Sequence, residues 1–151
     1  MTMQIDTPSR RSHCASVVCR VSAPQALAFL ADGLQLGQWA LGCWQTEAVG
    51  GGVVRGRSLF DDSPSWVRPV VDETHMTVVY HVGGAPDALS PRIHAVVAAD
   101  PGGCRISLHA SRTPGMDDAR WLRRGRSHEL EVLLVQARLE HQAAPPAPQV
   151  L

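Results

Sequence analysis

The C-terminal part of the chain carries the feature that most restricts its fold, a long run of apolar residues at helical spacing. Between positions 117 and 141, six residues recur alternately four and three positions apart: Trp121, Gly125, His128, Val132, Val135 and Leu139. This spacing puts all six on one side of an α-helix. At 1.5 Å per residue the predicted helix is roughly 35–40 Å long, so it can cross a whole sheet.

The segments before this helix predict a sheet and two short helices. Residues 14–21 alternate between apolar and polar side chains, as a strand does. Ser22, a proline in the first turn and Gln25 then indicate a helix start. This helix runs to Asp32, and a second short helix is expected over 34–41. Six further strands are expected at residues 44–49, 53–60, 65–71, 74–82, 92–99 and 104–112.

Short links rich in glycine, proline and aspartate separate these strands, which favours an antiparallel meander. Pro69 lies inside the fourth strand and predicts a bulge or an edge position there. One strand, two helices, six strands and a long helix make an α+β order, with about seven antiparallel strands curved around the C-terminal helix. Such a sheet cannot close fully over the helix, so we expect a cavity between the two.

Composition and chain ends exclude several classes of protein. The 151 residues include fourteen arginines, no lysine and fourteen acidic residues, so the net charge is zero and general nucleic-acid binding is not expected. No segment is apolar enough to span a membrane and no signal peptide is visible, so the expected location is the cytoplasm. One domain is expected over 14–142, between a flexible N-terminal arm (1–13) and a disordered proline-rich tail (143–151).

The sequence shows no metal site and no cofactor motif. Its four cysteines are widely spaced, without a C-x-x-C pair, and are expected to be small buried side chains: Cys14, Cys19, Cys43 and Cys104. Phosphate-loop, dinucleotide-binding, zinc-protease and serine-hydrolase motifs are all missing. We therefore expect neither metal nor cofactor. A homodimer is a common assembly and stays open.

Four parts of the sequence resemble a known protein family. They are the helix start Val21-Ser-Ala-Pro-Gln-Ala-Leu-Ala-Phe-Leu-Ala-Asp32, the following Trp39, and the strands 56–60 and 76–82. Over about residues 14–141 the chain resembles the START-like superfamily, also called SRPBCC or polyketide cyclase/dehydrase-like. The resemblance implies the helix-grip fold and a pocket for a hydrophobic or aromatic small molecule under the long helix. Its members include carriers, enzymes and co-chaperone domains, so the fold alone does not choose a function.

His128 is the most informative candidate, because it interrupts the apolar stripe of the last helix where that stripe should face the sheet. An imidazole there is either a core residue or a pocket acid, base or hydrogen-bond donor. On the strand over 74–82, the apolar face carries Tyr80, whose hydroxyl is the second candidate. The candidate catalytic pair is therefore His128 and Tyr80.

Further ligand-binding candidates come from the strands and from the start of the last helix. An arginine on a pocket-facing strand would bind a carboxylate or enolate, and Gly125 would leave room beside the helix backbone. Which face of the third, fourth and sixth strands lines the cavity stays open. The full set of ligand-binding candidates is Trp66, Arg68, Tyr80, His94, Trp121, Arg124, Gly125 and His128.

Three functions follow from these residues and the resemblance. The first is binding of a small hydrophobic or aromatic molecule without chemistry, because no nucleophile–base constellation is recognisable. The second is a cyclase/aromatase- or dehydratase-like enzyme that uses His128 and Tyr80. The third is a co-chaperone-like interaction domain that uses the sheet face or the basic cluster between Arg120 and Arg126.

Overall fold

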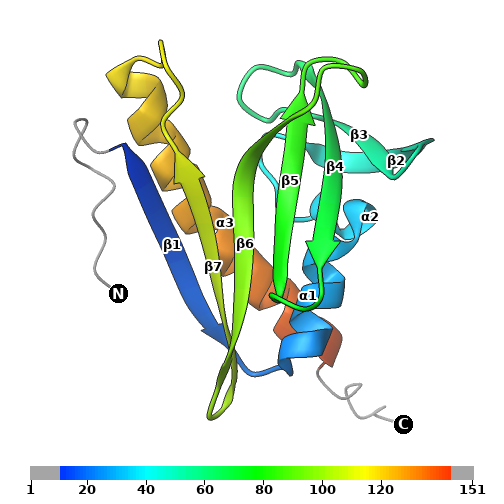
Figure 1. Ribbon diagram of the computed structural model, residues 1–151, viewed down its shortest axis with the longest axis vertical. Coiled ribbons are helices and arrows are strands. Elements are labelled where there is room, and N and C mark those ends of the chain that lie inside the picture. Colours follow the sequence, from blue (N-terminus) through cyan, green and yellow to red (C-terminus); the bar gives the residue numbers. More distant parts are fainter. Residues whose placement is uncertain (1–10, 144–151) are drawn as a thin grey trace, which may run out of the picture.

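In the computed structural model, which describes residues 11–143, a seven-stranded antiparallel sheet curves around one long helix (Figure 1). The strands are β1 (Ser12–Cys19), β2 (Trp44–Gly50), β3 (Val53–Arg57), β4 (Pro64–Asp72), β5 (Thr77–Gly83), β6 (Ser90–Asp100) and β7 (Gly103–Ser111). The helices are α1 (Ala23–Ala31), α2 (Gly33–Leu36) and α3 (Asp118–Ala143). This is the predicted α+β helix-grip architecture. The expected arm and tail lie mostly outside the described residues.

The sheet is the predicted meander, with strand order β1-β7-β6-β5-β4-β3-β2. Between β2 and β3, the glycine triplet at 50–52 has φ values of 99°, 64° and 74°, which glycine adopts without the strain of a side chain. Pro69 is paired with Tyr80 of β5, whereas the last pair that joins β3 and β4 is Val54 with Val67. Pro69 therefore lies at a local edge, where its missing N–H costs no ladder hydrogen bond.

Two boundaries near the N-terminus differ from the sequence expectation. β1 begins at Ser12, so His13 belongs to the sheet and is buried, although it was expected in the N-terminal arm. α2 covers only four residues, and Gly33 begins it instead of ending α1. The reason is a cap: the Asp32 carboxylate accepts a hydrogen bond from Leu34 N at 2.9 Å, which starts a new helix directly after α1.

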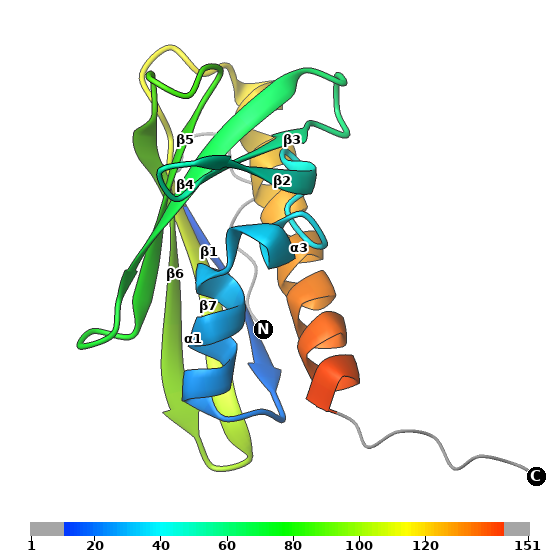
Figure 2. The same cartoon turned by 90° about the vertical axis from the view of Figure 1, so that its right-hand side faces the viewer.

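The core fills the space between the inner sheet face, α1 and the C-terminal half of α3 (Figure 2). As expected, the inner face of β5 carries Tyr80, together with Val78; that of β7 carries Ile106, Leu108 and Ala110, and all five are at most 5 % exposed. No helix in the part of the chain that the structure describes is long and apolar enough to cross a membrane.

Candidate functional site

A cavity of about 390 Å³ lies between the N-terminal half of α3 and the inner face of the sheet. Its walls come from α3, from β4, β5 and β6, from the segment after α2, and from the loop between β3 and β4. The size falls within the range of small-molecule pockets.

One wall of the cavity is apolar. It is formed by side chains from the sheet and from the α2 region: Leu36, Trp39, Val67, Tyr80, Val82 and Ile93. The ring of Trp39 meets that of Tyr80 edge to face, with centroids 5.7 Å apart. The Tyr80 hydroxyl donates a hydrogen bond to Leu30 O at 2.7 Å. Tyr80 therefore offers its ring to the cavity, and burial raises the pKa of its hydroxyl well above the usual range.

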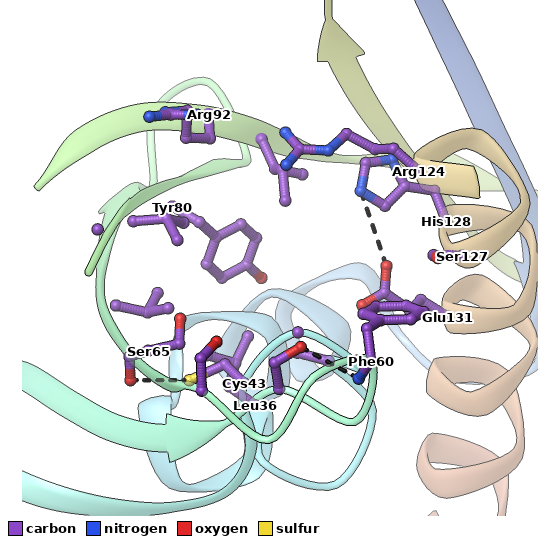
Figure 3. Close-up of a pocket in the computed structure, with 18 of the residues that line it drawn as sticks. Leu36, Cys43, Phe60, Ser65, Tyr80, Arg92, Arg124, Ser127, His128 and Glu131 are labelled. Atoms are coloured by element: carbon purple, nitrogen blue, oxygen red, sulfur yellow. Dashed lines mark hydrogen bonds and ion pairs between the residues drawn. The ribbon is translucent and has the colours of Figure 1, made fainter. Parts of the chain in front are cut away.

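The α3 side of the cavity and one residue of β6 carry positive charge. Four arginines line the cavity, one from β6 and three from α3: Arg92, Arg120, Arg123 and Arg124. Arg123 lies 5.8 Å from the ring centroid of Phe60 in the loop between β3 and β4, which is the distance of a cation–π contact. Arg124 is partly buried, and Figure 3 shows its side chain extending from α3 into the cavity.

His128 and Glu131 form a buried pair on α3, one turn apart, with His128 Nε2 3.7 Å from Glu131 Oε1 (Figure 3). Burial lowers the pKa of His128 to about 3, and His13 and Arg124 add to this effect. Burial raises the pKa of Glu131 to about 8, against a hydrogen bond from Leu41 and the charge of Arg124. At pH 7 the pair is therefore a neutral imidazole beside a protonated carboxylic acid, not an ion pair.

Glu131 is also connected to the loop between β3 and β4, through the peptide groups of Leu41. Leu41 N donates a hydrogen bond to Glu131 Oε2 at 2.9 Å. The carbonyl of Leu41 accepts a hydrogen bond from Leu59 N at 2.9 Å. Leu59 precedes Phe60, which lines the cavity. Two hydrogen bonds thus link the buried acid to the loop at the cavity edge.

Several buried nitrogens near the cavity have no hydrogen-bond partner among the described residues: both ring nitrogens of His13, Nδ1 of His128, and Nε1 of Trp39 and of Trp121. The His13 ring lies against both the His128 and the Trp121 rings, with centroids 4.8 Å apart in each case. Burial lowers the pKa of His13 to about 4, with Arg124 and His109 contributing. Buried polar groups are usually paired, and of these residues Trp39 and His128 line the cavity.

Of the eight candidates from the sequence, the structure brings three to this cavity: Tyr80, Arg124 and His128. Trp66 and Arg68 lie on the outer sheet face, because the alternate β4 residues Ser65 and Val67 face inward. His94 is exposed and lies opposite His109 in the register of β6 and β7. Trp121 and Gly125 are buried on α3 but do not line the cavity. We therefore place these five outside the site.

Sequence reasoning missed Glu131 and Arg92. Glu131 follows His128 by three positions, a spacing that puts two side chains on one helix face, so an acidic residue beside the apolar stripe was a usable signal. Arg92 had no such signal. The pairing of β5 with β6 shifts between Tyr80–Ile93 and His81–Pro91, and this irregularity lets both Arg92 and Ile93 line the cavity.

No protein-family model matches the chain, and no curated protein matches it by sequence. Solved structures do match. The Zhui aromatase/cyclase from a Streptomyces species is 15 % identical with a TM-score of 0.64, over 89 % of this chain and 96 % of that one. The Aha1 dimer from Colwellia psychrerythraea is 14 % identical with a TM-score of 0.65, over 87 % and 97 % of the two chains.

A third similar structure is Ara h 8.0201, which is 15 % identical with a TM-score of 0.61, over 85 % of this chain and 96 % of that one. The three proteins have different names but share one architecture. At such identities the similarity establishes the fold and leaves the function open. The chain thus has the helix-grip fold, which it shares with these three solved structures.

Proposed function

We propose that the protein binds a small hydrophobic or aromatic molecule in the cavity between α3 and the sheet. The observation that carries this proposal is the contrast between the two cavity walls. An apolar, aromatic wall of Trp39 and Tyr80 faces a polar wall on α3. Binding sites for small molecules combine a mostly apolar lining with a few polar groups that set orientation.

The test is binding of a neutral fluorescent probe, N-phenylnaphthylamine, to the purified protein and to a variant with a filled cavity. Val82→Trp places an indole on the inner face of β5, where Val82 lines the cavity. Val79→Trp makes the same change on the outer face of the same strand and serves as the control. We expect Val82→Trp to weaken binding at least about tenfold and Val79→Trp to leave it unchanged. Equal binding by all three proteins would overturn the proposal.

One observation favours an enzymatic alternative: His128 and Glu131 are two neutral titratable groups that face the same cavity. The protonated acid can donate a proton within the site, whereas the lowered pKa of His128 makes its imidazole a weak base. Tyr80, the other expected catalytic residue, is a weaker candidate because its proton is held by Leu30 O.

The enzymatic alternative is tested on compounds that the protein retains when it is purified from its host. Mass spectrometry of extracts from wild type and from His128→Asn compares the retained species. A different retained mass in the variant would support chemistry at the site. The same mass in both proteins supports binding without chemistry. The interaction-domain, homodimer and cytoplasmic expectations stay predictions.

A further inference from the structure

The charges around the cavity do not balance. Four arginines line it, and the lining includes two acidic residues, Asp61 and Glu131. Asp61 accepts hydrogen bonds from Ser63 and lies near Arg123, and these contacts lower the pKa of its carboxyl. Glu131 does not offset the arginines, because burial keeps it protonated at pH 7. The remaining positive charge comes from Arg92, Arg120 and Arg124.

Arg124 shows the imbalance most directly. It is partly buried, and among the described residues no hydrogen bond or ion pair joins its guanidinium to another group. Burial and the like charges of Arg120 and Arg92 lower its pKa. A partly buried guanidinium that feels the like charges of two others is stabilised when an anion joins it.

The cavity also holds a second unpaired donor. The indole Nε1–H of Trp39 is buried without an acceptor among the described residues, and Trp39 lines the same cavity. An indole nitrogen can only donate, and a guanidinium can only donate. A polar group that binds to either of these two side chains must therefore be a hydrogen-bond acceptor.

We propose that the molecule bound in this cavity is an aromatic acid, whose ring lies against Trp39 and Tyr80 and whose carboxylate lies between Arg124 and Arg92. The inference rests on the proposed function and names the chemical class of its ligand. A planar carboxylate suits a guanidinium because two parallel N–H···O hydrogen bonds can form. Within the cavity such a pair is screened less than it would be on the surface.

A matched pair of probes tests this proposal: naphthoate, which is anionic at pH 7, and naphthamide, which has the same ring and nearly the same shape without charge. Calorimetric titration gives the ratio of the two affinities for each protein. We expect wild type to prefer naphthoate by at least about tenfold, the effect of one hydrogen-bonded charge pair. The preference should fall as salt is added.

Three variants test which arginines cause the preference for naphthoate over naphthamide. Arg124→Gln and Arg92→Gln are expected to bring the two affinities to within about threefold of one another. Arg126→Gln is the control, because Arg126 is an exposed arginine of α3 outside the cavity lining, and its ratio should match wild type. Thermal denaturation checks that each variant folds.

The outcomes separate the two proposals. If naphthamide binds as tightly as naphthoate to wild type, the aromatic-acid proposal is wrong and binding of hydrophobic molecules stands. A preference that survives both Arg124→Gln and Arg92→Gln also overturns it. If neither compound binds and N-phenylnaphthylamine does not bind either, both proposals fail.

Discussion

The two halves of α3 have the same apolar spacing but different surroundings. In the C-terminal half, Val132, Val135 and Leu139 pack into the core and are at most 1 % exposed. Closer to the N-terminus, Arg124 and His128, together with Glu131 at the middle of the helix, line a cavity, and Nδ1 of His128 has no hydrogen-bond partner among the described residues. The comparison shows that one half of this helix holds the fold together, whereas the other half presents chemistry at some cost in stability.

The largest effect is expected from the packed half. Leu139→Ala should lower the free energy of unfolding by about 3 kcal/mol, because it removes buried methyl groups and leaves a void. Leu133→Ala is the control on the same helix, since Leu133 is 53 % exposed, and it should change stability by less than about 0.5 kcal/mol. Denaturant unfolding measures both. Similar losses in the two variants would contradict the proposed division of α3.

A smaller effect of opposite sign is expected from the cavity half. The raised pKa of Glu131, about 8, means that the folded state holds this proton more tightly than the unfolded state. Its contribution to stability is full below pH 4.5 and is lost as pH rises through 8. Glu131→Gln removes this loss, so we expect the stability of the variant relative to wild type to increase as the pH rises toward 8.

Unfolding curves between pH 6 and pH 9 measure this difference. The groups around Glu131 are His128, Arg124, Tyr80 and the Leu41 amide, and Gln can still accept the hydrogen bond from Leu41. Glu129→Gln, on the same helix, is the control and should follow the wild-type curve. If the stability of Glu131→Gln declined with pH as steeply as that of wild type, the claim that Glu131 is protonated in the folded protein would be wrong.

The smallest effect on stability is expected from Tyr80, which belongs to the packed core and also lines the cavity. Tyr80→Phe removes the hydrogen bond to Leu30 O and should cost about 1 kcal/mol of stability. Binding of N-phenylnaphthylamine should stay within about twofold of wild type, because the ring remains. A tenfold loss of binding without a loss of stability would instead indicate that the Tyr80 hydroxyl contacts the ligand.

Much of the fold follows from local patterns. Alternation identifies the inner faces of β5 and β7, and the stripe from Trp121 to Leu139 identifies α3. These patterns work because burial on one face repeats every two residues in a strand and about every 3.6 in a helix. The β4 face was harder to choose, since Trp66 and Val70 are as apolar as the inward Val67, so alternation gave no decision.

The candidate site was predictable only where a polar residue interrupts an apolar pattern. His128 satisfied that condition and does line the cavity. Arg92 did not, because its position depends on a shift in pairing between two strands, which a single strand's sequence does not reveal. His13 is likewise buried through contacts with Trp121 and His128, which are more than a hundred positions away along the chain.

The peptide link from Glu131 through Leu41 to Leu59 has a consequence for how the site could be observed. Both hydrogen bonds are made by Leu41. Its carbonyl accepts from the Leu59 amide, and its own N–H donates to the buried Glu131 carboxyl. Amide exchange reports the local opening of such bonds. We expect the exchange rate of Leu59 N–H to slow when the cavity is occupied, which gives a readout of binding from an exposed loop.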